Sequence, residues 1–350
     1  MTSTADRADL IARVEDQLRV IGRLVRNSML DVLPDGEPHR WLYGPMREYP
    51  ARAGKALRPA LCLSAGRAFG GESDSLLGVA VAIELLHNAF LVHDDIVDGS
   101  EMRRGRRTLA ASYGLGTALN AGDGLAMVAG QVLRKSTRRF DPYLADLVWA
   151  EFDTMAMRTL EGQATEIGWQ FDDVESLGPE DYLELIMHKT CWYTTIHPLR
   201  VGAIVGSGGS VDLGPLVRFG FHFGAAFQIR DDLLNLIGDE RTYGKEILGD
   251  LYEGKRTLPL IHLLASAVGD DRRFVRDYLR RGRAERSEEL VRTVRALMDD
   301  YGSITFTREY AEGILLVAQE YFEHAFAEAR PGSDLEFLRA LVPYVWSRWR

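Results

Sequence analysis

Ala89–Asp98 reads AFLVHDDIVD, and Ala226–Asn235, much later in the chain, reads AFQIRDDLLN. Each stretch begins with an Ala-Phe pair, continues with two adjacent aspartates and ends with an oxygen-bearing side chain three positions after the second aspartate. Neither stretch contains Pro or Gly, and helical spacing predicts that Asp94 and Asp98 share one face of a helix. The chain therefore holds two copies of one acidic motif.

The same spacing predicts that Asp231 and Asn235 share a face, while Asp95 and Asp232 point about 100° away around their helices. Carboxylates at the end of an apolar segment are costly to desolvate, and Mg²⁺ offsets this cost when a substrate phosphate completes its oxygen shell. One copy alone is more simply a solvated helix end, but two copies beside basic residues favour a metal site. The candidate ligands are Asp94, Asp95, Asp98, Asp231, Asp232 and Asn235.

The composition is that of an ordinary globular protein: 350 residues, 46% hydrophobic and 27% charged. The net charge of -9 argues against a nucleic-acid partner, which would need a basic field. Two cysteines, Cys62 and Cys191, are too few for a disulfide framework and predict a reducing cytoplasm. The N-terminal stretch lacks the apolar core of a signal peptide, and we expect no membrane span.

Hydrophobic periodicity predicts an all-α protein, because alternating strand patterns are absent. Segment 33–54 is rich in Pro and Gly and predicts a linker of turns, and Pro198 predicts a kink. No interdomain linker is visible, so we expect one domain over 1–350, with an N-terminal helix and linker in 1–50. The expected helices are 6–32, 75–98, 108–138, 142–168, 179–205 and 212–237, followed by a helical part over 259–350.

Basic residues accompany the acidic motifs. Arg103 and Arg104 follow the first motif within GSEMRRGRRT, where bidentate guanidinium groups beside a Mg²⁺ site would suit a diphosphate. Lys55 and Arg58 lie one turn apart at a predicted helix start, where free N–H groups favour anions. Each pair alone could be a solvated surface feature. His87, two turns before the first motif's leading aspartate, could join the same pocket, although a core or surface histidine is the simpler alternative.

Lysine is rare in this chain, yet four lysines fall in short motif-like strings: Lys55, Lys189, Lys245 and Lys255. A compact ammonium group binds phosphate differently from guanidinium, so lysine in such strings favours phosphate binding over chance placement. The Gly-rich stretch after the second acidic motif carries Lys245 and Lys255, and we expect it to form a lid over phosphate. A Walker loop is absent, and no protein nucleophile is needed if metal ions and arginines stabilise a leaving diphosphate.

At this point the sequence resembles the trans-isoprenyl (polyprenyl) diphosphate synthases, over about residues 40–265. HDDIVDGSEMRRG resembles the family's first aspartate-rich motif and FQIRDDLLNLIGD the second, while GKALRP, HKT and GKRTLP resemble three further family strings. The resemblance implies a single-domain bundle of antiparallel helices around a central substrate cavity, usually dimeric. It also implies head-to-tail condensation of isopentenyl diphosphate with an allylic diphosphate.

The resemblance assigns roles residue by residue. Mg²⁺ ions, up to about three per active site, would be held by the aspartates of both motifs. They would bridge to the allylic diphosphate, helped by Arg103, Lys189, Lys245 and Lys255. Isopentenyl diphosphate would be held by Lys55, Arg58, His87 and Arg104. Lys189, Thr190 and Gln228 would border the allylic cation, and the departing diphosphate would accept the proton.

Two positions depart from the family pattern, and two others bear on product length. Asn235 stands where many members have a third aspartate, which predicts a shift in metal affinity, and Ala56 replaces a common arginine. Ala89 and Phe90, five and four positions before the first aspartate, match the floor of the family's chain pocket. The small residue at 89 favours geranylgeranyl diphosphate (C20) as product, with farnesyl diphosphate (C15) next.

Two other functions stay open. A class I terpene cyclase would use the same metal-assisted ionisation without a second diphosphate site, so the second group of cations favours condensation over cyclisation. A non-catalytic subunit that regulates a prenyl synthase would tolerate loss of its metal ligands, whereas both motifs here are nearly intact.

Overall fold

The computed structural model describes residues 4–238 and 247–347. Lys245 lies outside these described residues. The chain is built from α-helices, and the all-α prediction is confirmed. It folds into two compact units, each described by itself below: the first comprises Met1–Met155, Tyr193–Gly220 and Ala318–Arg350, and the second comprises Ala156–Trp192 and Phe221–Val317. The single-domain assignment stays a prediction.

In chain order the first part holds α1 (Thr4–Val32), a π-helical turn (His39–Tyr43), α2 (Gly44–Ala51), α3 (Leu57–Ala68), α4 (Ser73–Val97), β1 (Met102–Arg103), β2 (Arg106–Arg107), α5 (Leu109–Tyr113), α6 (Leu115–Thr137) and α7 (Pro142–Phe171). There follow α8 (Pro179–Ile186), a π-helix (Met187–Ile196), α9 (His197–Ser207), α10 (Gly214–Ile237), α12 (Gly249–Glu253), α13 (Leu258–Ser266) and α14 (Gly269–Leu279). A 3₁₀ turn (Arg283–Glu285), α15 (Glu288–Asp300), α16 (Ser303–Ala325) and α17 (Ser333–Ser347) complete it.

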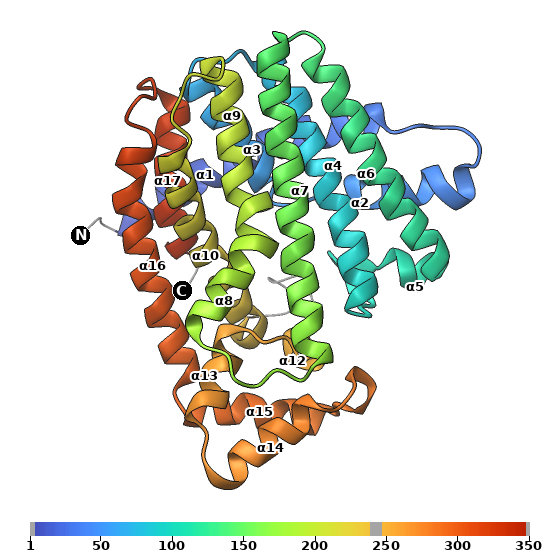
Figure 1. Cartoon of the computed structure of the whole chain (residues 1–350), viewed down its shortest axis with the longest axis vertical. Helices are drawn as coiled ribbons and strands as arrows, with labels where there is room; N and C mark the ends of the chain where they lie inside the picture. The colour runs from blue at the N-terminus through green and yellow to red at the C-terminus, as the bar shows by residue number, and fades with distance from the viewer. Residues whose placement is uncertain (1–3, 239–246, 348–350) are drawn as a thin grey trace. The chain divides into compact units, whose positions relative to one another are not determined.

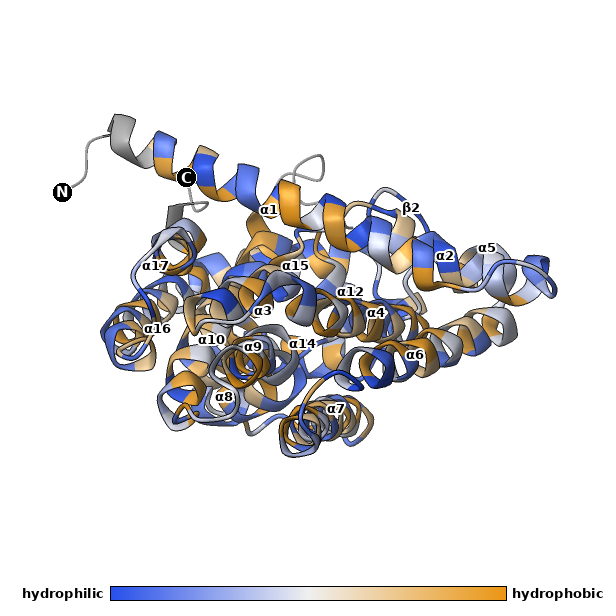
Figure 2. Cartoon of the chain, turned by 90° about the horizontal axis from the view of Figure 1, so that it is seen from above, coloured by the Kyte–Doolittle hydropathy of each residue, from blue (hydrophilic) through white to orange (hydrophobic). Residues whose placement is uncertain are grey.

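The first unit is organised around α4. This helix packs against α6 along its length, while α3 packs between α4 and α9 (Figure 1). In Figure 2, α4 is largely hydrophobic, whereas α1 alternates between hydrophilic and hydrophobic stretches. The helix Ser73–Val97 is long and apolar enough to cross a membrane by length and composition alone, but 72% of its apolar window is buried inside the protein. Such burial is that of a core helix, and it places the acidic motif at the end of a rigid element.

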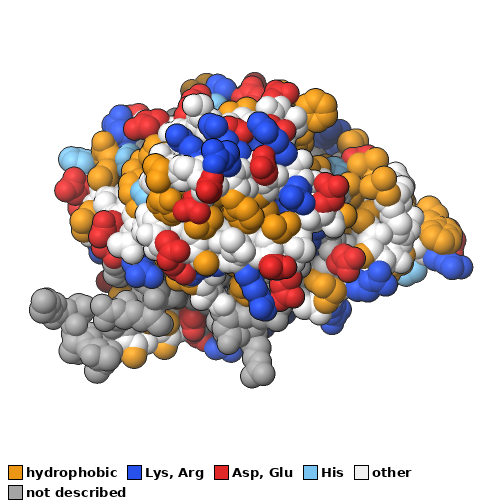
Figure 3. Space-filling model, turned by 90° about the horizontal axis from the view of Figure 1, so that it is seen from below, with side chains coloured by type: hydrophobic (Ala, Val, Ile, Leu, Met, Phe, Trp, Pro, Cys, Tyr) orange, Lys and Arg blue, Asp and Glu red, His pale blue; other side chains and the backbone are white. Residues whose placement is uncertain are grey.

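The second unit is held by contacts of α13 with α8, α14 and α15. Several of its described arginines pair with acids; for example, Arg276 contacts Glu175 at 2.7 Å. On the face drawn in Figure 3, acidic and basic side chains lie next to one another. Charge is therefore interspersed on this face, which keeps local fields small.

The structure refines several sequence predictions. The predicted helix over 108–138 is two helices, because Gly114 at φ 82° breaks it between α5 and α6. The predicted linker over 33–54 contains a further helix, α2, in which Pro45 occupies the first turn, where a missing N–H costs nothing. The kink predicted at Pro198 takes another form: a π-helix over Met187–Ile196 ends where α9 begins, and Pro198 sits in the first turn of α9.

Candidate active site

The first acidic motif occupies the C-terminal turns of α4 and its C-cap residue, Asp98. The side chain of Asp94 is 25% exposed, while that of Asp95 is 1% exposed. This difference follows from the 100° step between neighbours on a helix, which turns one carboxylate outward and the next inward. Asp98, the C-cap residue of α4, is half-buried and lies one turn beyond Asp94. The outward face therefore carries Asp94 and Asp98, as the spacing predicted.

Asp95 is fixed by a tyrosine and an arginine. The hydroxyl of Tyr49, at the end of α2, donates a hydrogen bond to Oδ2 of Asp95. Arg103 donates from Nε to Oδ1 of Asp95 at 2.8 Å, and its Nη2 lies 3.7 Å from Asp94. Burial and the carboxylate of Asp95 both raise the pKa of Tyr49, so this hydroxyl stays a donor. The inner aspartate is thus a charged anchor that orients the motif.

A two-residue hairpin presents the arginines that follow the motif. β1 and β2 pair with Arg103 opposite Arg106, and the turn between them places Arg104 at φ 52° and Gly105 at φ 71°. Both lie in the left-handed region, which is costly for arginine, and such strain is often held at functional sites. The turn therefore sends Arg103 and Arg104 in different directions: Arg103 joins Asp95, while Arg104 donates to the backbone carbonyl of Arg52 at 3.3 Å.

Arg52 holds the hairpin in place, a role that the sequence did not reveal. Its Nη1 donates to the carbonyl of Arg103 at 3.1 Å and its Nη2 to the carbonyl of Arg107 at 2.9 Å. Glu48, one turn earlier on α2, accepts from the same Nη2 at 2.9 Å. Arg52 is 7% exposed, so these bonds form in a poorly solvated place where they count more.

A third group forms around Tyr193. The guanidinium carbon of Arg58 lies 4.3 Å from the centre of the Tyr193 ring, and Arg58 Nη2 donates to Oγ1 of Thr194 at 2.8 Å. The His87 ring lies 5.8 Å from the same ring, and the Phe90 ring meets it edge-on at 5.7 Å. Tyr193 thus joins two predicted isopentenyl diphosphate ligands to a predicted chain-length residue.

The remaining predicted residues of this unit differ in exposure. Lys55 is exposed just before α3, whereas Ala89 is fully buried on α4. Ala56, the N-cap residue of α3, is at φ 51°, which turns the chain sharply between Lys55 and Arg58. The sequence analysis did not single out Tyr193. Its position three residues after the HKT string was the one sequence feature that could have pointed to it.

The second acidic motif lies in α10, in the other unit, and it repeats the tyrosine bond of the first. Tyr182 on α8 donates to Oδ2 of Asp232 at 2.6 Å, and Gln228 donates from Nε2 to Oδ1 at 2.7 Å. Burial raises the pKa of Asp232 to about 7, more than the hydrogen bonds from Tyr182 and Gln228 lower it. Asp231, the outer residue of the pair, is half-buried.

The two inner aspartates therefore differ in charge compensation. Asp95 has an arginine partner, while Tyr182 and Gln228, which donate to Asp232, are neutral groups. A neutral donor stabilises a carboxylate less than a cation does. The charge of Lys255 also lowers the pKa of Asp232, but burial outweighs it, so this pKa stays raised.

Asn235, the last residue of the second motif, accepts two hydrogen bonds from the backbone near α12. It is 2% exposed, and its Oδ1 accepts the backbone N–H of Asp250 at 3.1 Å. Its backbone carbonyl accepts the N–H of Leu248 at 2.8 Å. Asn235 thus fastens the start of α12 to α10. Its assignment as a metal ligand stays a prediction.

The two described lysines of this unit are paired with glutamates. Lys189, in the π-helix, contacts Glu166 on α7, and Lys255, after α12, contacts Glu253 at 2.7 Å. A Cβ on Gly162 would lie 2.2 Å from the backbone N of Lys189, so only glycine lets α7 approach the π-helix this closely. Thr190 is buried and Gln228 is half-buried. The sequence analysis did not single out these two glutamates. A phosphate could take the place of each carboxylate as the partner of its lysine.

Within the described residues, no three His, Cys, Asp or Glu side chains converge closely enough to hold a metal ion by themselves. The outward oxygens of Asp94 and Asp98 on one helix face still fit Mg²⁺, because this ion keeps several waters and takes only one or two carboxylates besides substrate phosphates. The carboxylate of Asp231 suits the same kind of ion.

Comparison with known proteins agrees with this chemistry. The polyprenyl synthetase family model matches residues 39–298. The geranylgeranyl pyrophosphate synthase of Geoglobus acetivorans is 33% identical over 303 residues, covering 86% of this chain and 90% of that protein. The octaprenyl diphosphate synthase of Escherichia coli is 31% identical over 74% of this chain and 76% of its own length.

A solved structure extends the similarity to the whole chain. The polyprenyl synthase of Caulobacter crescentus, complexed with calcium and isoprenyl diphosphate, superposes with a TM-score of 0.81 at 27% identity, covering 100% of this chain and 99% of that chain. The chain therefore belongs to the polyprenyl synthetase family, the trans-isoprenyl diphosphate synthases, and is a prenyltransferase that elongates prenyl chains.

Proposed function

We propose that this prenyltransferase condenses isopentenyl diphosphate head-to-tail with an allylic diphosphate in a Mg²⁺-dependent reaction, and that its main product is geranylgeranyl diphosphate (C20). The observation that carries the proposal is the grouping of Arg58 and His87 around Tyr193 in the unit that also holds the first acidic motif. A second diphosphate site distinguishes condensation from cyclisation. The names of the relatives include both C20 and longer-chain synthases, so C20 rests on residues 89 and 90.

The residues supply binding and orientation. In the proposal, Asp94 and Asp98 and, in the second motif, Asp231 hold Mg²⁺, which would stabilise the charge that develops on the leaving diphosphate. Asp95 and Asp232 are the further metal ligands of the proposal, and the hydrogen bonds from Tyr49 and Tyr182 fix their orientation. Lys189 and Lys255 exchange their glutamate partners for phosphate oxygens, and Lys245 adds a further cation from the adjoining stretch.

The carbon chemistry then needs few protein groups. The C–O bond of the allylic diphosphate breaks, the double bond of isopentenyl diphosphate attacks the cation, and the departing diphosphate takes the proton that is lost. Thr190 and Gln228 border the cation, and Arg103, held by Asp95, faces the departing diphosphate. Burial of Thr190 keeps water away from this intermediate.

The fold position of the chain-length residues supports C20. Ala89 has no exposed surface, and Phe90 is half-buried against Tyr193. A small residue at 89 leaves space on one side of α4, while the aromatic ring at 90 limits it on the other, since the two side chains point about 100° apart. Farnesyl diphosphate (C15) is the next candidate.

A homodimer in the cytoplasm is part of the same proposal. Leu115 and Leu119, one turn apart on α6, are 62% and 48% exposed. Such an apolar pair suits a contact with a second copy of the chain. Light scattering after gel filtration would measure the mass in solution, and a monomer would remove this part of the proposal.

The test is an incubation of purified protein with Mg²⁺, isopentenyl diphosphate and a C5, C10 or C15 allylic diphosphate, followed by sizing of the products. We expect C20 as the main product, and no reaction in EDTA. Asp94→Asn should lower the rate by at least about a hundredfold, while Asp74→Asn, an exposed aspartate at the other end of α4, should leave it unchanged. Hydrocarbons formed without isopentenyl diphosphate would instead identify a cyclase.

A further inference from the structure

A small cavity in the first unit lies next to the predicted site for isopentenyl diphosphate. Its volume is about 20 Å³, room for about one water molecule. It is lined by Gly22, Val25, Arg26, Met29, Pro50, Arg52, Gly54, Ala56, Glu84, Asn88 and Arg104. The lining thus combines three arginines with a single acid, Glu84, among the described residues.

Glu84 lies on α4, one turn before His87, and is only 7% exposed. Its Oε2 is buried and receives no hydrogen bond within the described part of the chain. A buried carboxylate without a donor is costly unless nearby cations compensate it. Burial raises the pKa of Glu84, and Arg58 and Arg104 oppose that rise. Of these two arginines, Arg104 lines the same cavity as Glu84.

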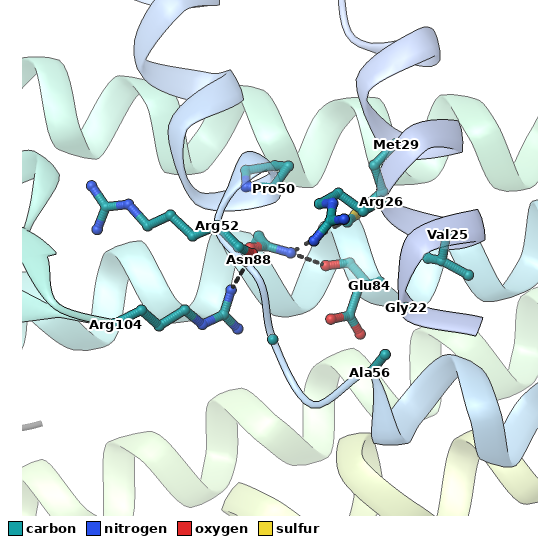
Figure 4. A pocket seen from close by; sticks show the side chains of 11 residues that line it. Gly22, Val25, Arg26, Met29, Pro50, Arg52, Ala56, Glu84, Asn88 and Arg104 are labelled. Atoms are coloured by element: carbon teal, nitrogen blue, oxygen red, sulfur yellow. Dashed lines mark hydrogen bonds between the residues drawn. The ribbon is translucent and has the colours of Figure 1, made fainter. Parts of the chain in front are cut away.

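The compensation is mutual. Burial lowers the pKa of Arg104, Glu84 raises it, and Arg103, Arg58 and Arg52 lower it again by repulsion. Figure 4 shows Arg104 and Glu84 on opposite sides of the cavity, reached from different segments of the chain. Gly54 permits this approach, because a Cβ there would lie 2.9 Å from Nη2 of Arg104. Without the acid, the clustered guanidinium groups would repel one another.

The structure assigns Glu84 a positioning role: across the cavity that both residues line, it orients the guanidinium group of Arg104 toward the diphosphate of isopentenyl diphosphate. This inference rests on the proposed condensation. Glu84 does not touch the substrate in this role. It acts through Arg104, in the way that a second carboxylate fixes the orientation of a ligating side chain at metal sites.

The direction in which Glu84→Gln changes the KM for isopentenyl diphosphate distinguishes a positioning role from a simple effect of charge. A negative charge near a diphosphate opposes its binding, so by charge alone Glu84→Gln would lower the KM for isopentenyl diphosphate. By positioning, the same change lets the guanidinium group of Arg104 turn away from the diphosphate and raises that KM. We expect a rise of about tenfold, the size of losing one well-oriented charged hydrogen bond.

The experiment compares Glu84→Gln, Glu84→Asp and Glu151→Gln with the wild type. Steady-state rates are measured while isopentenyl diphosphate is varied at saturating allylic diphosphate, and then the reverse. Glu151 is a matched control, because it is also a buried glutamate of this unit, 8% exposed, and pairs with Arg200 at 2.8 Å away from the cavity. Thermal unfolding of each variant with and without isopentenyl diphosphate adds a readout that needs no turnover.

We expect Glu84→Gln to raise the KM for isopentenyl diphosphate, to leave the KM for the allylic substrate within about twofold and to lose the stabilisation by isopentenyl diphosphate. Glu84→Asp should recover part of the loss, and Glu151→Gln should change neither KM. An unchanged or lower KM for isopentenyl diphosphate in Glu84→Gln would overturn the inference, as would equal effects on both substrates. A wild type that makes no elongated product would instead remove the proposed function.

Discussion

The hydroxyl of Tyr182 donates a hydrogen bond to Oδ2 of Asp232 at 2.6 Å, and both side chains are buried. Tyr49 makes the same bond to Asp95 in the first motif. In both motifs the inner aspartate is thus turned away from its outer neighbour and fixed by a phenol. The bond leaves the outer aspartate, Asp94 or Asp231, at the more accessible position.

Tyr182→Phe tests what this bond contributes. Removing the hydroxyl leaves the side-chain amide of Gln228 as a donor to Asp232, so the motif should be less well oriented for a cation. We expect the Mg²⁺ concentration for half-maximal rate to rise severalfold and kcat to fall by about tenfold. The measurement is a Mg²⁺ titration of the initial rate.

Tyr278→Phe is the matched control for that titration. Tyr278 is equally buried in the same unit, but its hydroxyl donates to the backbone carbonyl of Leu251 at 2.6 Å. Both variants should lose about 1 kcal/mol of unfolding free energy. If both shifted the Mg²⁺ requirement alike, the tyrosine bond to Asp232 would have no specific role.

Asp232 should make the stability of the metal-free protein depend on pH. Its folded-state pKa of about 7 lies above the ordinary aspartate value of 3.8, so between these values the folded protein binds more protons than the unfolded one. Stability from this group is fully present below about pH 4 and is lost as pH rises to about 7, by an amount on the order of a few kcal/mol.

Asp232→Asn removes this titration. In EDTA, urea unfolding of the variant and of the wild type should give free energies that diverge between about pH 4 and pH 7 and differ by a constant amount above that. The variant should be the more stable one above this range. Curves that stay parallel from the acidic to the neutral end would show that Asp232 does not titrate there.

Ala89→Phe should shorten the product. Ala89 is fully buried on α4, so a phenyl group must occupy space that the growing chain would use or displace a neighbour. We expect C15 or C10 products in place of C20, measured by sizing the products of a timed reaction. Phe90→Ala, which removes the ring that meets Tyr193, should lengthen them. An unchanged product distribution in both variants would contradict the assignment of the pocket floor.

Gly162→Ala should be severely destabilising. The added methyl group would lie 2.2 Å from the backbone N of Lys189, and backbone atoms cannot move aside as a flexible side chain can. We expect a loss of several kcal/mol in urea unfolding. Gly168, on the same helix, has open space where a methyl group would be added, with no described atom within 4 Å, and Gly168→Ala should gain about 0.5–1 kcal/mol through helix propensity. Similar losses in both variants would refute the close approach.

Much of the site could be predicted because its residues are local in the sequence. Asp94, Asp98 and Arg103 fall within ten positions, so helical spacing alone orders them relative to one another. The outward and inward aspartates of each pair also follow from the 100° step. In short motifs of this kind, the helical spacing already fixes how the side chains are arranged relative to one another.

The partners of the inner aspartates could not be predicted, because they come from distant segments. Tyr49 is 46 residues before Asp95, and Tyr182 is 50 residues before Asp232. Arg52 contacts a hairpin 51 to 55 residues away. Which of many tyrosines and arginines reaches a given carboxylate depends on how the helices pack, and hydrophobic periodicity does not specify that packing.

The sequence by itself determined the helical class, the two acidic motifs and the family, since these depend on spacing along one chain. Tertiary structure decided which charges are compensated: Asp95 by Arg103, Asp232 by two neutral donors and the charge of Lys255, and Glu84 by Arg104 across a cavity. The physical reason is that burial and the partners of a charge, which set its free energy, are properties of packing between segments far apart in the chain.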